Sequence, residues 1–582
     1  MLTGINFQNY KAFREGHIEI KPITILLGAN SVGKSSILQL ILMLQQTSIC
    51  DPNYKSAMKL FGGFVSMGEP KNLLRGKNEK NILSLKIEFE SSELGQLLKE
   101  KLLAAYTTEI LSFARIMNGI YSQNQESILS KFLSDNFTNK SETKIKSSKE
   151  SLNLFFVHKL LMLSDFDKEP INKDKFYDLI SIIAEVFPEE KLIDLPDEIK
   201  QIDLLGSNDF TRHLKISSKK EEYLLTYDFL HNLSDASTSK KFEISYDLVY
   251  VSKIKNFVIK SVSLYAGNEK FISFEFDESN EGRLSIISST FFSDRKLKDY
   301  TYKGVSRLFK SNKTIFDFVP EINQKQTQDN NYSVFGNIVY RIFRGFIENV
   351  ERNFGQNQIN YVSPLRAHPK RYYFLDKAKY SSFLDTLDGD ALAEILKDND
   401  TLRNQVNSWL KKFGLTVKVS QLEDIIHKLT INQNFLELDI TDVGFGISQV
   451  LPVIIQGFLS LKGSITLIEQ PEIHLHPKMQ ADLADLFIDM SITKGKDKMD
   501  SINKYVIIET HSEYLLKRLR RRIAEGNISS ESVAIYLIDP QTEGKGALIK
   551  KLDINQTGFF EWPIDFYGGE ILNDTFEFLK KQ

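Results

Sequence analysis

The sequence predicts an α/β fold organised around a phosphate-binding loop. Residues 28–35 read Gly-Ala-Asn-Ser-Val-Gly-Lys-Ser and fit the pattern G-x-x-x-x-G-K-[ST]. The run before them, 23–27, is apolar and β-branched, which predicts a buried strand. The run after them, 36–44, is rich in leucine, which predicts a helix. In this order, backbone N–H groups and the N-terminus of a helix face a phosphate.

The loop predicts a site for ATP and Mg²⁺. By analogy with other loops of this pattern, we expect Lys34 to reach the β- and γ-phosphates and the Ser35 hydroxyl to bind Mg²⁺. The alternative is a glycine-rich turn in an unrelated α/β protein. The residues expected to cradle the nucleotide are Gly28, Ala29, Asn30, Ser31, Val32, Gly33, Lys34, Ser35 and Ser36. Two aromatic residues upstream, Tyr10 and Phe13, could stack on an adenine or pack in the core.

The composition is that of an ordinary globular protein. The chain of 582 residues is long for one domain, and hydrophobic and charged residues make up 42% and 26% of it. The net charge of −2 provides no overall field that would favour nucleic acid or a membrane surface. The single cysteine, Cys50, excludes an internal disulfide framework and fits a reducing cytosol.

We expect a cytoplasmic protein with no membrane segment. Residues 2–7 resemble a strand and lack the basic and apolar regions of a secretory signal. The longest membrane-like run, 450–461, contains Pro452, Gln456 and Gly457 and is far shorter than the roughly 20 apolar residues that a spanning helix needs.

Three segments are expected along the chain. Residues 1–90 form the first part of a nucleotide-binding lobe, in which two short strands precede the loop and another strand covers 82–89. Residues 91–357 form an inserted domain. From 358 to 582 the α/β pattern resumes and completes the lobe, and its last part, 531–582, is expected to be a strand–strand tail.

The insertion has mixed helical and β character. Apolar residues at helical spacing from Leu94 to Met117 predict a helix, and apolar alternation over 242–290 predicts an antiparallel meander. A further helix is expected near 334–352. The sequence contains no sustained heptads, so a long coiled-coil arm is not expected.

Polar stretches separate these elements. A polar tract at 324–331 is expected to be a linker, and two stretches rich in lysine and serine, 138–150 and 217–222, are expected to be solvated loops. Four lysines of the first stretch could instead touch a phosphate backbone: Lys140, Lys144, Lys146 and Lys149.

The second half of an ATPase site is expected at two other strand ends, because hydrolysis needs an acid for Mg²⁺ and a group that orients water. One apolar strand ends in Glu469, Gln470 and Glu472, which places carboxylates at the carboxyl edge of the sheet beside the loop. A second apolar strand, 505–510, ends in His511, which could contact the γ-phosphate.

Some of these residues could also form a metal site. His474 and His476 lie close in sequence to Glu472 and could be joined by His511. Their spacing resembles no common structural zinc pattern, and no thiol ligand accompanies them, so a role beside the nucleotide is favoured.

A further glycine-rich stretch, 442–449, precedes an apolar helix. Gly444 and Gly446 at the start of this helix create a second anion-facing N-terminus, and we expect them to bind nucleotide together with Ser448. Simple helix capping is the alternative. The order of loop, glycine-rich stretch, acidic strand end and strand-end histidine favours the nucleotide role.

With these motifs in place, the chain resembles the ABC-type ATPases of the SMC, Rad50 and OLD kind. More narrowly, it is similar to the prokaryotic AAA_15/AAA_21 ATPases that carry a C-terminal DUF3696 segment. The resemblance covers 1–90 and 358–582, and the insertion matches no family that we could name. The matching stretches are 5–13, 28–35, 361–366, 442–449, 468–477, 509–512 and 558–563.

The resemblance implies a P-loop NTPase of ABC/SMC-head type, its lobe split by a large α+β insertion. It also implies a head-to-head homodimer or higher homo-oligomer, in which the signature glycines of one copy, Gly444 and Gly446, cover the γ-phosphate held by the other. Glu469 then takes the position of the Walker B acid that binds Mg²⁺, and His511 that of the switch histidine.

Three departures from the family pattern bear on hydrolysis. Gln470 stands where the catalytic glutamate normally is, and an amide cannot accept a proton, so either Glu472 is the base or hydrolysis is slow. Phe445 stands where related signatures often have serine. The family's metal-linked glutamine has no match, because Gln45 and Gln46 lie too far down the first helix.

The resemblance implies an ATP-gated sensor or scaffold in prokaryotic defence against phage or plasmids. Its partner would be a separately encoded effector, a nuclease or toxin. The alternative is a DNA-repair or chromosome-maintenance ATPase that clamps DNA; a transporter motor fits less well because no membrane segment is present. A nuclease domain of the TOPRIM type is not expected in this chain, because Asp539 and Asp553 lack the necessary acidic cluster.

A basic row follows the strand-end histidine. These arginines could bind DNA, the effector or the partner subunit, or form a solvated face that complements a helix dipole. They are Arg518, Arg520, Arg521 and Arg522.

Overall fold

The computed structural model describes most of the chain. It covers residues 1–121, 128–137, 170–188, 213, 215–236, 239–277, 283–290, 295–305, 309–319, 333–374, 390–423, 425–433, 436–493, 501–502, 504–540, 546–562 and 580. The expected linker at 324–331 and the four lysines of the first polar stretch, Lys140, Lys144, Lys146 and Lys149, lie outside the described residues.

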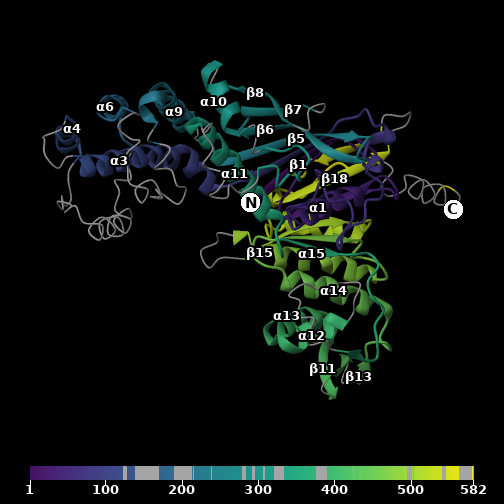
Figure 1. Cartoon of the computed structure of the whole chain (residues 1–582). Helices are drawn as coiled ribbons and strands as arrows, with labels where there is room; N and C mark the ends of the chain where they lie inside the picture. Colours follow the sequence, from purple (N-terminus) through teal and green to yellow (C-terminus); the bar gives the residue numbers. More distant parts are fainter. Residues whose placement is uncertain are drawn as a thin grey trace. The chain divides into compact units, whose positions relative to one another are not determined.

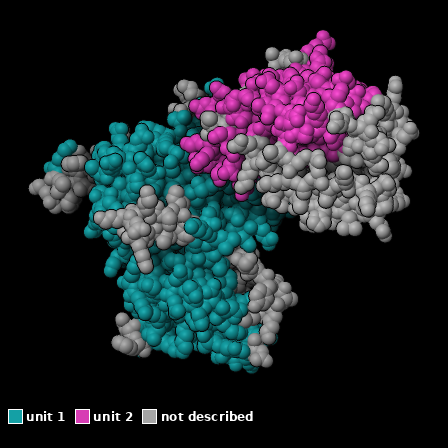
Figure 2. All heavy atoms as spheres, turned by 90° about the vertical axis from the view of Figure 1, so that its left-hand side faces the viewer, with its two compact units in different colours: residues 1–89, 247–258, 350–582 teal, residues 90–246, 259–349 magenta. Residues whose placement is uncertain are grey.

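Two compact units make up the described chain (Figure 2). The first contains residues 1–89, 247–258 and 350–582, and the second contains 90–246 and 259–349. The first unit holds every stretch on which the expected nucleotide site depends. The expected division into lobe and insertion stays a prediction.

The predicted strand, loop and helix are present in the first unit. Strand β3 (Ile23–Gly28) is buried along its whole length, and helix α1 (Lys34–Ser48) begins directly after the loop. Gly33 caps the helix with a φ of 113°, a left-handed conformation that a side chain would strain. A Cβ atom at Gly33 would also lie 2.8 Å from the ring of Phe13, so this position requires glycine.

The antiparallel strands near the amino terminus follow the prediction. Strand β1 (Leu2–Tyr10) pairs with β2 (Phe13–Glu19) and with β4 (Leu83–Glu90). Tyr10 and Phe13 are completely buried and pack edge-on against Phe7. The adenine-stacking alternative is therefore wrong for both rings, which belong to the core.

Five parallel strands form the centre of the first unit. From one side to the other they are β18 (Val533–Pro540), β3, β17 (Tyr505–Glu509), β14 (Ile465–Glu469) and β9 (Ile359–Val362). The three strands β3, β17 and β14 are buried on both faces, which explains their continuous apolar sequences. Strand β17 lies between the loop strand β3 and the acidic strand β14.

The strands near the carboxyl terminus belong to this sheet. Strand β18 pairs directly with β3 in parallel, and β19 (Ala547–Leu552) lies between β18 and β2. The sequence predicts these two strands as a tail after residue 531. In the structure, β18 is one of the two strands that pair with the loop strand β3.

Helices and a small sheet complete the first unit, and Figure 1 shows several of them in green beside the central sheet. The helices are α12 (Asp390–Asp398), α13 (Asp400–Leu410), α14 (Phe445–Leu459), α15 (Pro477–Ser491) and α16 (Glu513–Ala524). The short 3₁₀ turns are η1 (Pro70–Leu73), η2 (Arg75–Lys77), η7 (Lys411–Phe413) and η8 (Ser530–Ser532). The remaining strands are β10 (Tyr373–Phe374), β11 (Leu415–Glu423), β12 (Ile426–Gln433), β13 (Leu436–Asp439), β15 (Ile492–Thr493) and β16 (Ser501–Ile502).

The second unit combines helices with the predicted meander. Its strands are β5 (Lys241–Val251), β6 (Asn256–Ala266), β7 (Glu269–Asp277) and β8 (Arg283–Ser289), of which residues 247–258 belong to the first unit. Its helices are α2 (Ser92–Gln96), the π-helical turn η3 (Leu97–Lys101), α3 (Leu102–Tyr121), α4 (Ile128–Asn136), α6 (Lys173–Val186), α9 (Ile216–Ala236), α10 (Arg295–Val305) and α11 (Val334–Phe354), of which residues 350–354 belong to the first unit.

Several expectations for the second unit can be compared with the structure directly. The helices predicted from Leu94 and near 334–352 are confirmed, as is the antiparallel pairing of β6, β7 and β8. The loop expected at 217–222 is wrong, because these residues form the first turns of α9. Buried residues at helical spacing further along, Tyr223 and Tyr227, hold this polar stretch in a helix.

Lys504 is a buried cation at the end of helix α14. Its Nζ donates hydrogen bonds to the carbonyl oxygens of Gly457, at 2.8 Å, and Phe458, at 2.9 Å. These carbonyls end the helix, where its dipole favours a positive charge. Burial nevertheless lowers the pKa of Lys504 to about 8.

In the described part of the chain, no helix combines the length and the apolar character needed to cross a membrane.

We predict that Lys504 makes the first unit more stable as the pH rises from about 8 toward 10. The unfolded chain has a lysine pKa of about 10.4, so in this window the folded protein binds fewer protons than the unfolded chain. The free energy of unfolding should therefore rise by on the order of 1–3 kcal/mol. Urea denaturation of wild type and Lys504→Met at pH 7.5 and 9.5 measures this difference. The same pH dependence in both proteins would contradict it.

Candidate functional site

The phosphate-binding loop is open at its tip and closed at its base. Ala29, Asn30 and Ser31 are exposed to solvent, and Ser31 has a left-handed φ of 63°. At the base, Lys34 is buried and its Nζ donates to the carbonyl oxygens of Gly28, at 3.0 Å, and Ala29, at 2.7 Å. The lysine thus lies folded on its own loop.

Two carboxylates lie at the carboxyl edge of the sheet beside this loop. Glu469 ends β14 and Glu509 ends β17, and the two residues are paired in the parallel register. Glu509 Oε2 accepts a hydrogen bond of 2.8 Å from the Ser35 hydroxyl, and its Oε1 lies 3.7 Å from Lys34 Nζ. Glu469 Oε1 accepts a hydrogen bond of 2.8 Å from the Tyr361 hydroxyl.

Burial of these carboxylates raises their pKa values. Desolvation is the main cause for both Glu469 and Glu509, and the charge of Glu509 raises the pKa of Glu469 further. The hydrogen bond from Ser35 and the charge of Lys34 act in the opposite direction on Glu509. Burial also raises the pKa of Tyr361, so this hydroxyl stays a hydrogen-bond donor.

Glu509 is a site residue that the sequence reasoning did not identify. We expected Glu469 to be the acid beside Ser35; the Ser35 hydroxyl donates its 2.8 Å hydrogen bond to Glu509, and its interaction with Glu469 also lowers the pKa of that carboxyl. The sequence does contain a sign of this role, because Glu509, like Glu469, is an acidic residue at the end of an apolar strand. The sequence does not say which of two acidic strands lies next to the loop strand.

Glu472 and His511 form a second pair near the loop. The backbone N–H of His511 donates to Glu472 Oε1 at 2.6 Å. Glu472 Oε2 and His511 Nε2 are buried atoms without a hydrogen-bond partner among the described residues. Burial raises the pKa of Glu472, and burial together with the charge of Lys34 lowers the pKa of His511, so His511 is neutral at pH 7. Both residues are polar groups available to a ligand.

Gln470 has a constrained backbone at the end of β14. Its φ of 43° is left-handed, which is uncommon for a residue with a side chain and is typical of functional sites. Its N–H donates to the carbonyl oxygen of Glu509 at 2.8 Å, and its own carbonyl oxygen accepts from Arg366 at 3.3 Å. The backbone is thus held from two sides.

Arg366 joins the helix that follows the glycine-rich stretch to this edge of the sheet. Its guanidinium is buried and donates to the carbonyl oxygen of Gln449 on α14, at 3.2 Å, and to that of Glu469, at 2.9 Å, as well as to Gln470. Burial lowers the pKa of Arg366 to about 10, which leaves it charged at neutral pH. Its contacts are backbone carbonyls of the same chain.

The glycine-rich stretch is packed at one glycine and open at the other. Gly444 caps α14 and is exposed, with no atom within 4 Å of the place where a Cβ would lie. A Cβ at Gly446 would lie 2.6 Å from the carbonyl oxygen of His474, so packing alone requires glycine there. Ser448 is buried in the same chain. Of the two glycines, Gly444 is the one exposed to solvent.

A groove of about 670 Å³ adjoins the loop. Its wall includes Ser31 and Val32 from the loop, Lys11 from the β1–β2 turn, and Arg75 and Asn78 near η2. The residues after β18, Gly546 and Ala547, close another side. The groove combines two cations with amide and backbone polar groups.

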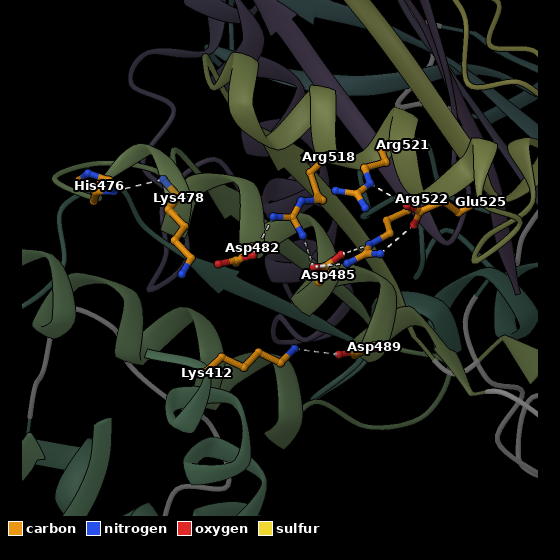
Figure 3. Close-up of polar contacts among 10 residues, drawn as sticks. All are labelled: Lys412, His476, Lys478, Asp482, Asp485, Asp489, Arg518, Arg521, Arg522 and Glu525. Atoms are coloured by element: carbon orange, nitrogen blue, oxygen red, sulfur yellow. Dashed lines mark hydrogen bonds and ion pairs between the residues drawn. The ribbon is translucent and has the colours of Figure 1, made fainter. Parts of the chain in front are cut away.

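The four residues of the zinc alternative are not brought together as a ligand set in the described structure. His474 is exposed, and His476 caps α15 by accepting a hydrogen bond from Lys478 N on its Nδ1 at 3.3 Å (Figure 3). The part of the chain that the structure describes contains no group of three or more His, Cys, Asp or Glu residues placed to hold a metal ion. Gln45 and Gln46 donate hydrogen bonds to the backbone carbonyl oxygens of Ile359 and Lys59.

The basic row on α16 contacts its own chain (Figure 3). Arg518 and Arg522 bind Asp485 of α15 at 2.6 to 3.0 Å, and Arg521 binds Glu525 at 2.6 Å. Arg520 donates to the carbonyl oxygen of Gly558 at 2.7 Å and lies over the rings of Phe560 and Trp562. These contacts favour the interpretation of a structural face over a nucleic-acid surface.

A family model described as AAA ATPase domain (AAA_15) matches residues 1–516. The chain belongs to this family. It is thus an ATPase of the P-loop class, and the predicted α/β P-loop fold is confirmed. The match runs through 91–357, where the motifs alone revealed no family, and it ends before 531–582. The resemblance of the last segment to DUF3696 stays a prediction.

Comparison with solved structures finds SMC heads. One is an SMC head bound to the C-winged helix domain of ScpA (9% identity, 95% of this chain and 98% of that chain covered, TM-score 0.35). Another is the SMC head domain from Thermotoga maritima (6% identity, 95% of this chain and 99% of that chain covered, TM-score 0.31). A third is the Smc head domain with an extended coiled coil bound to the C-terminal domain of ScpA derived from Pyrococcus furiosus (11% identity, 100% of this chain and 98% of that chain covered, TM-score 0.31). Comparison with curated protein sequences finds no match.

We predict that Arg366→Ala destabilises the first unit by about 2–4 kcal/mol, because it removes a charged donor from three backbone carbonyl oxygens, those of Gln449, Glu469 and Gln470. Arg371→Ala is the matched control: Arg371 forms an exposed ion pair with Asp442, at 3.0 Å, and its loss should cost less than about 1 kcal/mol. Urea denaturation followed by circular dichroism measures both. Equal stability of the two variants would show that Arg366 does not hold α14 to the sheet.

Proposed function

We propose that this chain is a slow ATPase that dimerises around ATP and Mg²⁺ and acts as an ATP-gated sensor or scaffold for a separate effector protein. One observation carries the ATP site: Lys34 and Ser35 lie within one hydrogen-bonded cluster with a strand-end carboxylate, beside an open loop tip. The family match supports the same activity.

The nucleotide would bind along the loop with its phosphates on the exposed N–H groups. Lys34 would leave the carbonyl oxygens of Gly28 and Ala29 for the β- and γ-phosphates. The groove beside Ser31 and Val32 would receive the nucleoside. Ser35 and the strand-end acids, including Glu469, would hold Mg²⁺, which neutralises charge on the phosphates as the bond to the γ-phosphate breaks.

Slow turnover follows from the residues beside the γ-phosphate. Gln470 would orient the attacking water without accepting its proton. Glu472 is the proposed base, since its raised pKa makes it a better proton acceptor and its Oε2 has no other partner in the described chain. Neutral His511 would donate a hydrogen bond from its ring N–H to an oxygen of the γ-phosphate.

Dimerisation would complete the site. The exposed start of α14 at Gly444 would face the γ-phosphate held by a second copy, in the head-to-head arrangement that the sequence resemblance implies. Closure would then depend on ATP, and a dimer that hydrolyses slowly would stay assembled. Such a dimer suits a scaffold more than a motor.

The role in defence against phage or plasmids rests on the sequence resemblance, including that of 531–582 to DUF3696. The effector would be a separately encoded nuclease or toxin. Indifference of the ATPase to duplex DNA, with co-purification of the protein encoded beside it, would support this role. An ATPase stimulated by DNA, with binding that weakens steeply with salt, would support a DNA clamp instead.

We predict that Lys34→Ala abolishes ATP binding and ATP-dependent dimerisation, because it removes the cation that meets the β- and γ-phosphates. Fluorescence titration with a methylanthraniloyl-ATP measures binding, and light scattering after size-exclusion chromatography measures dimerisation. Lys11→Ala, which removes a different cation from the wall of the groove, is the control and should weaken binding only partly. Wild-type binding by Lys34→Ala would remove the ATP site from this loop.

We predict that Gln470→Glu speeds ATP hydrolysis by about 10- to 100-fold, because it places a proton acceptor where the amide stands. Glu472→Gln should slow the wild-type reaction by a similar factor if Glu472 is the base. Phosphate release under saturating ATP measures both. Should Glu472→Gln turn over ATP at the wild-type rate, the role of base would move to another group.

A further inference from the structure

We propose that Glu509 is the carboxylate that binds Mg²⁺ together with Ser35, and that Glu469 is a positioning residue that orients a water ligand of the ion. This inference rests on the proposed ATP site and changes the assignment made from the sequence, which gave the metal to Ser35 and Glu469.

The first argument is the distance between two oxygen atoms. Mg²⁺ binds six oxygen ligands in a near-ideal octahedron at about 2.0–2.1 Å, so neighbouring ligands lie about 2.9 Å apart. Ser35 Oγ and Glu509 Oε2 lie 2.8 Å apart. An ion bound to the Ser35 hydroxyl would therefore find the Glu509 carboxylate in the adjacent ligand position with little movement.

The second argument is the place of Glu469. Its Oε1 accepts the Tyr361 hydroxyl, at 2.8 Å, and its carbonyl oxygen accepts Arg366, at 2.9 Å. Strand β17 lies between β14 and β3, so Glu469 ends a strand that does not pair with the loop strand, although its carboxyl also interacts with Ser35. A carboxylate held in this way is suited to orient a water ligand of the metal ion.

The third argument is charge. Without nucleotide, Lys34 Nζ lies 3.7 Å from Glu509 and neutralises it. When Lys34 turns to the phosphates, Glu509 would be left as a buried anion beside them, which is costly unless a cation replaces the lysine. Mg²⁺ at Ser35 is that cation. Glu509 would thereby oppose ATP that arrives without its metal.

The ligand chemistry fits Mg²⁺. A hydroxyl and carboxylate oxygens are the ligands that magnesium takes from proteins, and substrate phosphates and water supply the rest. A cage of three or more protein ligands is not needed.

The test compares Glu509→Gln with Glu469→Gln in the full chain. Titration with methylanthraniloyl-ATP, in Mg²⁺ and in EDTA, measures how far the metal tightens nucleotide binding. Electron paramagnetic resonance of Mn²⁺, with a non-hydrolysable ATP analogue present, measures the metal affinity directly. Glutamine keeps the size of the side chain and an oxygen for Ser35. Glu509→Asp is a second variant that keeps the charge.

Glu509→Gln should lose at least about 100-fold in Mn²⁺ affinity, whereas Glu469→Gln should lose about tenfold. In EDTA, Glu509→Gln should bind the nucleotide as tightly as wild type or more tightly, because the opposing charge is gone. Glu509→Asp should fall between wild type and Glu509→Gln.

The proposal is overturned if Glu509→Gln keeps wild-type Mn²⁺ affinity, or if Glu469→Gln loses more of it. Failure of the ATP site itself is a different result: wild type would then bind no nucleotide in Mg²⁺ or in EDTA. Thermal unfolding of each variant shows whether a loss of affinity comes from loss of the fold.

Discussion

The burial of two glutamates at one edge of a parallel sheet is the constraint on which the site depends. Glu469 and Glu509 end neighbouring strands in register, and desolvation raises the pKa of both. A buried anion is costly unless a cation or hydrogen-bond donors face it. Lys34 and the hydroxyls of Ser35 and Tyr361 meet that need when no ligand is bound. Phosphates and Mg²⁺ would redistribute these same contacts.

The sheet that holds these groups is assembled from distant parts of the chain. The loop strand β3 has β17 on one side and β18 on the other, each about 500 residues away in sequence. The phosphate-binding loop is therefore a property of the whole first unit, although its residues are consecutive. A Cβ at Gly28 would lie 2.3 Å from the carbonyl oxygen of Ile538 on β18, which shows how closely the late strand approaches the loop.

Arg366 and Gly446 connect the glycine-rich stretch to the acidic edge. Arg366 binds carbonyl oxygens at both places, and Gly446 lies against His474, which follows the acidic strand. In the proposed dimer, the start of α14 would meet the partner's nucleotide while Gln470 would meet the chain's own. A rigid link between them is a physical route by which one bound nucleotide could influence the other.

The sequence by itself determined the features that depend on local pattern. The loop, its strand and helix, the acidic strand ends and the meander follow from periodicity and from glycine positions, because these are encoded within a few residues. The tertiary structure decided which groups meet. It placed Glu509 beside Ser35, buried Tyr10 and Phe13, gave Arg518, Arg521 and Arg522 of α16 acidic partners, and put β18 beside the loop strand. Strand order and side-chain pairing depend on contacts between residues hundreds of positions apart, and no local pattern carries that information.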